Sequence, residues 1–272
     1  MKKVRPPQVA GYFYPAEPDS LHNEIQKMLN EAKLNKTFDK IIGIVSPHAG
    51  YMYSGKTAAF AYNAIKNKDY KTAIVISPSH SEYFPGISIY DGEAYQTPLG
   101  IVEIDEDKAQ KLVQGSKLIF RGVQGHRREH ALEVQIPFLQ TVLNDFKIVP
   151  IVMGDQSKVF VDELARKLAE VMDDKTIIVA SSDLSHFYNA NEANVLDSLV
   201  ERRINDFDYE KLQQDLDAHR CEACGGGPIV AMMKAAALNN YHKAEVLKRT
   251  DSGDVTGDKS EVVGYLSAVV YE

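Results

Sequence analysis

Three histidines in this 272-residue chain occupy equivalent places, because each follows an apolar, β-branched run by one or a few residues. They are His48, His80 and His186, which follow the runs at 41–46, 73–77 and 176–181. Imidazole is the commonest metal ligand among side chains and the acid/base best matched to neutral pH. One such histidine would most simply be a hydrogen-bonded loop residue. Three in equivalent places favour a functional cluster, without saying which job each one has.

Polar and aromatic neighbours of these histidines could support the same chemistry. Asp183, three residues before His186, can hold an imidazole in one tautomer, and it can equally cap a following helix. Tyr53, shortly after His48, either lines a pocket with its hydroxyl or packs against the pocket's rim. His130 could reach the site from a loop, although its place at the start of a helix-like segment also suits capping or packing.

The two cysteines, Cys221 and Cys224, form a Cys-x-x-Cys pair. Two cysteines are too few for a disulfide framework, and the pair could be a thioredoxin-like redox motif or half of a zinc site. No second pair completes a four-cysteine zinc site, and the glycines after Cys224 lack the Gly-Lys-Ser/Thr of a P-loop. Pro228 is typical of a first helical turn. Cys224 is therefore expected just before a helix N-terminus, which favours the thiolate, the form that binds metal.

The histidines can converge only if the fold places the ends of their strands side by side. Short apolar runs alternate with helix-like segments, which predicts one α/β domain over residues 1–272 with a mainly parallel or mixed sheet between two helical layers. Ligands of such folds bind at the carboxyl ends of the strands. Strands are expected at 41–46, 73–77, 87–90, 101–104, 147–153, 176–181, 244–250 and 262–271. Helices are expected at 20–32, 54–66, 106–114, 157–172, 191–205, 209–217 and 228–238, and at 129–143, where Pro137 should start or kink a helix.

The amino-acid composition argues against two classes of binding partner. The chain has 31 Lys+Arg against 38 Asp+Glu, a net charge of −7, and 44% hydrophobic residues. This acidic balance argues against nucleic acid and against an anionic membrane surface as partners, since both attract clustered positive charge. The N-terminal residues lack the pattern of a signal peptide, and no run of residues has the length and apolarity of a transmembrane helix. We therefore expect a cytoplasmic protein with reduced thiols.

Several motifs, in order over nearly the whole chain, resemble those of the Memo family, whose prokaryotic members are often called AmmeMemoRadiSam system protein B. The residues that carry the resemblance are Arg5, Ala10-Gly11, Phe13-Tyr14, Pro47-His48-Ala49-Gly50-Tyr51, Ser79-His80, Glu129-His130, Ser181-Ser182-Asp183-Leu184-Ser185-His186, Cys224-Gly225 and Pro228. The Memo family is similar in fold to the class III extradiol dioxygenases, which hold non-haem iron with two His and one Glu. The resemblance therefore implies the same α/β/α sandwich for this chain.

The resemblance also implies a metal site. His48 and His80 match the two ligand histidines of the dioxygenases, and His186 matches the histidine that acts as acid/base over the substrate. Cys224 stands where the dioxygenases carry the ligand Glu. A thiolate in that place suits copper or zinc as well as iron. Fe(II) is the expected metal, with copper as the alternative and zinc as a third candidate.

Two functions follow as expectations. The first is a metal-dependent oxidoreductase in which Asp183 orients His186, and a small aromatic substrate lies against Tyr53 and Phe13 with His130 nearby. The alternative is a non-catalytic module that binds a peptide or small ligand in the same cleft. Metal-assisted hydrolysis ranks last. The family name further implies a functional link to a radical-SAM protein and to a second protein of the same system.

Overall fold

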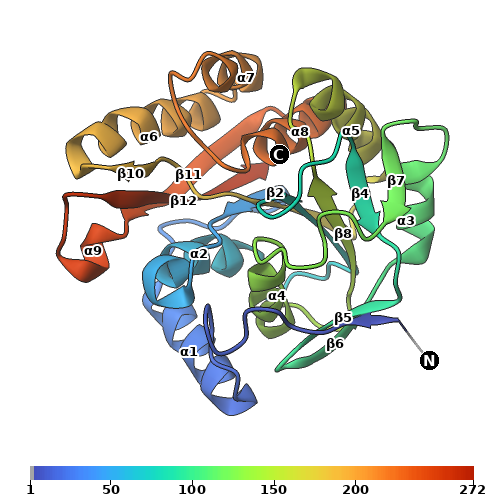
Figure 1. Ribbon diagram of the computed structural model, residues 1–272, viewed down its shortest axis with the longest axis horizontal. Coiled ribbons are helices and arrows are strands. Elements are labelled where there is room, and N and C mark those ends of the chain that lie inside the picture. The colour runs from blue at the N-terminus through green and yellow to red at the C-terminus, as the bar shows by residue number, and fades with distance from the viewer. Residues whose placement is uncertain (1–2) are drawn as a thin grey trace.

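A mixed β-sheet runs through the centre of the molecule in the computed structural model, which describes residues 3–272 (Figure 1). Within those residues the sheet has nine strands in the order β10-β12-β2-β9-β3-β8-β4-β7, with β11 paired to β12. The strands are β2 (Ile41–Ser46), β3 (Thr72–Pro78), β4 (Ile87–Tyr90), β7 (Ile119–Gly122), β8 (Lys147–Met153), β9 (Thr176–Ser181), β10 (His186–Tyr188), β11 (Lys243–Asp251) and β12 (Val262–Tyr271).

The middle of the sheet is parallel. Strands β2, β9, β3 and β8 pair in parallel in that order, whereas β12 and β4 flank them in antiparallel pairing. Every residue of β2, β3 and β9 is buried. Each of these strands contains Ile and Val with small residues and no charged residue, because helices cover both of its faces.

Helices form a layer on each side of the sheet (Figure 1). One layer contains α2 (Tyr51–Ile65), which packs on β2 and β12, with α1 (Pro18–Glu31) and α4 (Ile136–Val142) beside it. In the other layer α8 (Gly226–Leu238) packs on β9 and β3. In the same layer α5 (Lys158–Val171) and α7 (Tyr209–Asp217) pack on α8, α3 (Glu106–Val113) packs on α5, and α6 (Ala190–Asn205) packs on α7. A short α9 (Gly253–Thr256) follows β11. This α/β/α arrangement confirms the predicted fold.

The structure corrects two of the expected helices. The segment at 129–143 is helical only from its middle: a 3₁₀ turn spans Glu133–Gln135, and α4 begins at Ile136 with Pro137 in its first turn. Residues 129–132 are not helical, and the buried Glu129 side chain accepts hydrogen bonds from the backbone N–H groups of Ala131 and His80. The helix expected at 54–66 begins earlier, at Tyr51, directly after Gly50. In both places tertiary contacts at the sheet edge override the local pattern.

A small second sheet, in the order β1-β5-β6, packs beside the main one. It comprises β1 (Val4–Arg5), β5 (Ala94–Thr97) and β6 (Gly100–Glu103). Among residues 3–272, none of the helices combines the length and the apolarity needed to cross a bilayer.

A buried ion pair fixes the N-terminal segment to the segment that carries Glu129. Arg5 Nη1 lies 2.7 Å from Glu133 Oε2, and both side chains are almost fully buried. The same guanidinium donates to the backbone oxygens of His126 and Glu129, each at 2.7 Å. Glu133 also accepts hydrogen bonds from the Tyr14 hydroxyl and from the backbone N–H of Val9. Full pairing of this kind is what makes a buried charge tolerable.

Replacing Glu133 with Gln should lower the free energy of unfolding by about 3–5 kcal/mol, because Arg5 would be left buried without a counter-charge. Urea denaturation measures the difference. Glu245→Gln is the matched control, because the Lys36–Glu245 pair is exposed on both sides, and its loss should cost at most about 1 kcal/mol. Equal effects of the two substitutions would contradict the structural role of Glu133.

Candidate metal centre

Parallel pairing brings the predicted site residues to one edge of the sheet. Ser46, the last residue of β2, pairs with Ser181, the last residue of β9, and β3 runs parallel to β9 on its other side. The chain therefore leaves these three strands at the same edge. His48 and His80 each lie two residues beyond their strands, and β9 leads into residues 182–186.

His48, His80 and Cys224 come together at this edge. His48 Nε2 lies 3.2 Å from Cys224 Sγ, and the His48 and His80 rings meet edge to face with centroids 5.1 Å apart. One ligand atom from each of the three residues can be chosen so that all lie within 4.8 Å of one another. His48 is buried and His80 is exposed, so the cluster is open on the His80 side. Two imidazoles and one thiol form a donor set that suits a transition metal ion.

The tautomer of His48 follows from its hydrogen-bond network. His48 Nδ1 lies 2.9 Å from Ser181 Oγ, whose single proton is directed to the Ala131 carbonyl oxygen at 2.6 Å. Gln135 Nε2 donates to the same hydroxyl at 2.8 Å, and its bond to the Pro47 carbonyl fixes the orientation of the amide. Because Ser181 has no proton left for His48, His48 must donate from Nδ1. Its Nε2 lone pair is then free to bind a metal beside Cys224.

His80 is oriented in the same way by a carboxylate. Its Nδ1 lies 2.9 Å from Glu129 Oε1, and its backbone N–H donates to Glu129 Oε2 at 2.6 Å. Burial lowers the pKa of His80, but the hydrogen bond and charge of Glu129 outweigh it and the net shift is upward. A carboxylate on Nδ1 leaves Nε2 as the ligand atom and raises its basicity. Nothing in the local sequence points to these roles of Glu129 and Ser181, although both residues lie within the motifs that carry the family resemblance.

Cys224 is held against β9 by a glycine. A side chain at Gly225 would collide with the Ser181 carbonyl oxygen, so only glycine allows the loop before α8 to approach this closely. The backbone N–H of Asp183 donates to Cys224 Sγ at 3.3 Å. Burial, followed by the charge of Asp183, raises the pKa of the thiol. A nearby cation would reverse this preference, because metal binding deprotonates a ligand thiol.

Asp183 lies beside His48 rather than serving His186 as expected. Its Oδ1 accepts the His48 backbone N–H at 2.7 Å, and its Oδ2 lies 3.9 Å from His48 Nε2. Among the described residues, the hydrogen bonds of this carboxylate include none to His186. The reason is geometric: Asp183 lies two residues after the end of β9, which pairs with β2. Burial raises the pKa of Asp183 to about 7.

Aromatic rings form one wall of the site. The His130 ring lies 4.8 Å from the His80 ring and 5.6 Å from the His48 ring, with Phe13 packed at 4.8 Å on it. His130 therefore joins the cluster itself, and together with His80 and Glu129 it forms a second group that could hold a metal ion. Tyr53, in the first turn of α2, is 36% exposed.

His186 lies on the other side of the cluster. It is half-buried at the start of β10, and it lines a cavity together with Cys224. Burial lowers the pKa of His186, so the ring is neutral at pH 7 and can accept a proton. The next residue, Phe187, has a left-handed φ of 65° and is 73% exposed. This exposed ring contacts the ring of His186 edge to face.

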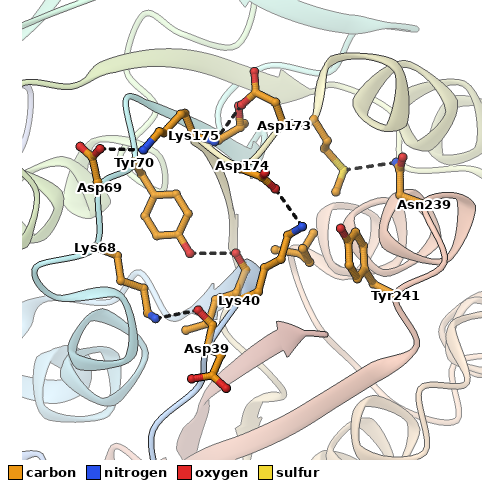
Figure 2. Close-up of a pocket in the computed structure, with 14 residues that line it drawn as sticks. Asp39, Lys40, Lys68, Asp69, Tyr70, Asp173, Asp174, Lys175, Asn239 and Tyr241 are labelled. Carbon is orange, nitrogen blue, oxygen red and sulfur yellow. Dashed lines mark hydrogen bonds and ion pairs between the residues drawn. The ribbon is translucent and has the colours of Figure 1, made fainter.

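A cavity of about 520 Å³ lies at the edge of the sheet opposite to His48, His80 and Cys224, and it is separate from the candidate metal centre (Figure 2). Its polar side chains bind one another: Lys40 pairs with Asp174, Lys175 with Asp69, and the Tyr70 hydroxyl donates to the Ile41 carbonyl. It also lies at the amino ends of β2 and β9, whereas ligands of parallel sheets bind at the carboxyl ends.

Comparisons with known proteins identify the family. The model of the Memo-like protein family matches residues 5–269. The chain belongs to the Memo family. A MEMO1 family protein of Methanocaldococcus jannaschii is 36% identical over 99% of this chain and 100% of its own length. MEMO1 family proteins of Methanosarcina mazei and Nitrosopumilus maritimus are each 37% identical, over 98% and 96% of this chain and 99% and 98% of their own lengths.

A solved structure supports the fold alone. An uncharacterized protein from Escherichia coli K12 covers 85% of this Memo chain and 100% of its own, with a TM-score of 0.51 and 15% sequence identity. The family match spans the whole candidate metal centre, because residues 5–269 include His48, His80 and Cys224.

Removing the Ser181 hydroxyl should weaken metal binding about tenfold to hundredfold, because His48 would lose the partner that fixes its tautomer. Competition with a chromophoric chelator for Zn²⁺, a redox-inert probe, measures the affinity of Ser181→Ala. Ser77→Ala is the matched control: Ser77 is fully buried near the end of β3, and its Oγ has no partner among the described residues. Equal affinities of the two variants would refute the proposed role of Ser181.

Proposed function

We propose that this protein is a metal-dependent oxidoreductase that acts on a small aromatic substrate, with His48, His80 and Cys224 as metal ligands. One observation carries the proposal: separate hydrogen bonds on Nδ1 leave Nε2 of both histidines free, and His48 Nε2 already lies 3.2 Å from Cys224 Sγ. Such preparation is typical of metal-ligating histidines, which bind another group through the second ring nitrogen.

The donor set fits Fe(II), with copper as the alternative and zinc as the third candidate. Three protein ligands on one side leave positions for substrate, and the exposed His80 side offers access. When bound, iron or copper would supply one-electron and dioxygen chemistry that no side chain provides. Fe(II) is preferred because the fold resembles that of the iron-dependent ring-cleaving dioxygenases.

The remaining residues bind the substrate and move its protons. Phe13 and His130, whose rings contact each other at a tilt of 55°, offer ring faces for an aromatic substrate, with the partly exposed Tyr53 of α2 as a third substrate contact. His186, kept neutral at pH 7 by burial, can take a proton from a phenolic hydroxyl and return it later. Asp183 contributes indirectly: it accepts a hydrogen bond from the backbone N–H of His48 and so holds that residue in place.

Protein purified without added metal should contain close to one equivalent of a transition metal, which Cys224→Ala and His48→Ala should each lose. Elemental analysis by mass spectrometry measures the content. Cys221→Ala is the control, because Cys221 is buried in the core outside the ligand group, and it should retain the metal. Stoichiometric metal that survives both ligand substitutions would overturn the site assignment.

With Fe(II) restored under reducing conditions, the wild-type protein should consume dioxygen in the presence of a catechol, and His186→Ala should slow this about 100-fold or more while retaining metal. An oxygen electrode gives the rate. His22→Ala, an exposed histidine of α1, should leave it unchanged. If no catechol supports uptake with iron or copper, the oxidoreductase proposal fails, and a non-catalytic module that binds a peptide or small ligand takes its place.

The family resemblance adds a proposal about partners. We propose that the protein acts together with a radical-SAM protein and a second protein of the same system, one of which would supply or consume its substrate. The acidic net charge of −7 argues against nucleic acid as a partner of this protein.

A further inference from the structure

A buried carboxyl group, that of Asp197 in α6, contacts the segment that leads to His186. The buried face of α6 consists of four side chains at helical spacing: Ala193, Asp197, Val200 and Ile204. Asp197 is 2% exposed and is the one acid on this otherwise apolar face. A carboxyl group in such a place costs free energy unless its neighbours satisfy it. Its partners therefore indicate what it does.

Asp197 holds the residue that precedes His186. Its Oδ1 accepts the backbone N–H of Ser185 at 3.1 Å. Its Oδ2 faces Gly264 of β12, where any side chain would collide with this oxygen, so glycine is needed for the close approach. The backbone of Gly264 in turn accepts the N–H of Leu184 at 2.8 Å and donates to the Ser185 carbonyl at 2.9 Å. Residues 184–185 are thus fixed by a side chain of α6 and by the backbone of β12.

The backbone next to His186 needs such support. Phe187 has a left-handed φ of 65°, a conformation that is unfavourable for a residue with a side chain and persists only where the surroundings impose it. On the C-terminal side, β10 pairs with β12, with His186 opposite Val263. On the N-terminal side, Asp197 supplies a hydrogen bond to Ser185. His186 therefore lies between two restraints, one of which is a single side chain.

Asp197 carries a charge that no ion pair neutralises within residues 3–272. Arg249 of β11, whose charge acts on it, is bonded instead to Glu201. Burial raises the pKa of Asp197 to about 6; Arg249 works against this shift and Asp251 of β11 adds to it. The carboxyl group is therefore mostly ionised at pH 7. An ionised acceptor binds the N–H of Ser185 more strongly than a neutral one would.

The same device occurs at each of the three histidines that follow strand ends. In each case a buried carboxyl group accepts a backbone N–H at or next to the histidine; the pairs are Asp183 with His48, Glu129 with His80, and Asp197 with Ser185, directly before His186. The first two carboxyl groups hold the candidate metal ligands. The third holds the candidate acid/base.

We infer that Asp197 is a positioning residue for His186, which it keeps in the place and orientation needed to take a proton from the bound substrate. The inference rests on the proposed function for the proton transfer, and on the contacts of Asp197 with Ser185 and Gly264 for the positioning. A proton acceptor that is displaced by a fraction of a bond length loses much of its effect on the rate, although the substrate still binds.

Asp197→Ala should lower kcat for catechol-dependent oxygen uptake about tenfold to hundredfold with little change in KM, because the metal ligands and the substrate contacts stay in place. Asp197→Asn keeps an oxygen acceptor without the charge and should fall between the wild type and Asp197→Ala. Asp105→Ala is the matched control: Asp105 accepts the backbone N–H of Lys108 at the start of α3, beside the amino end of β3, and its loss should leave kcat unchanged. A raised KM with unchanged kcat in the Asp197 variants would overturn the inference.

A second measurement reports on His186 itself, without substrate or turnover. Long-range proton–nitrogen NMR spectra of histidine-labelled protein, freed of metal by a chelator, show the rings of the eight histidines, and His186→Ala assigns the signal of His186. Asp197→Ala should shift or broaden this signal, and Asp197→Asn should do so less, while Asp105→Ala leaves it in place. An unchanged His186 signal in Asp197→Asn and in folded Asp197→Ala would also overturn the inference.

The two proposals fail separately. A displaced His186 signal in a protein that consumes no dioxygen with any catechol would support the positioning role and refute the oxidoreductase. Catechol-dependent oxygen uptake with the same kcat in Asp197→Ala as in the wild type would do the reverse.

Discussion

The candidate site depends on the parallel alignment of β2, β9 and β3. Ser46 and Ser181 end their strands as a registered pair, so the loops that carry His48 and Asp183 start at the same level. Ser181 then joins these loops to the segment before α4 through one hydroxyl, which donates to Ala131 and accepts from Gln135 and His48. A shift of one residue in this register would turn every strand side chain to the opposite face and separate the histidines.

Buried carboxylates hold the loops around this edge in place. Glu133 with Arg5 ties the N-terminal segment to residues 126–133, and Glu129 in that segment orients His80. Asp183 holds the backbone of His48. Each of these carboxyl groups lies away from water, and backbone N–H groups, a guanidinium or an imidazole satisfy its oxygens. The same hydrogen bonds therefore stabilise the loops and prepare the ligands.

Much of the fold could be predicted from the pattern of apolar runs, since parallel strands such as β3 and β9, buried at every position, carry a central run of Ile and Val. The pattern failed at residues 129–132, where helical periodicity continues but the Glu129 side chain binds backbone N–H groups instead. It also missed the short strands β1, β5, β7 and β10, whose pairings β1–β5, β4–β7 and β10–β12 join segments distant in sequence. Their pairing partners, not their own residues, make them strands.

The sequence by itself determined that three histidines and one cysteine follow strand ends or precede a helix, and motif resemblance marked His48, His80 and Cys224 as ligands. Only the tertiary structure decided which ring nitrogen each histidine presents, because that depends on Ser181 and Glu129, far away in the chain. The tertiary structure also places Asp183 against His48, whereas the sequence suggested that it would orient His186. Hydrogen-bond direction is a property of several segments together, so no local pattern can encode it.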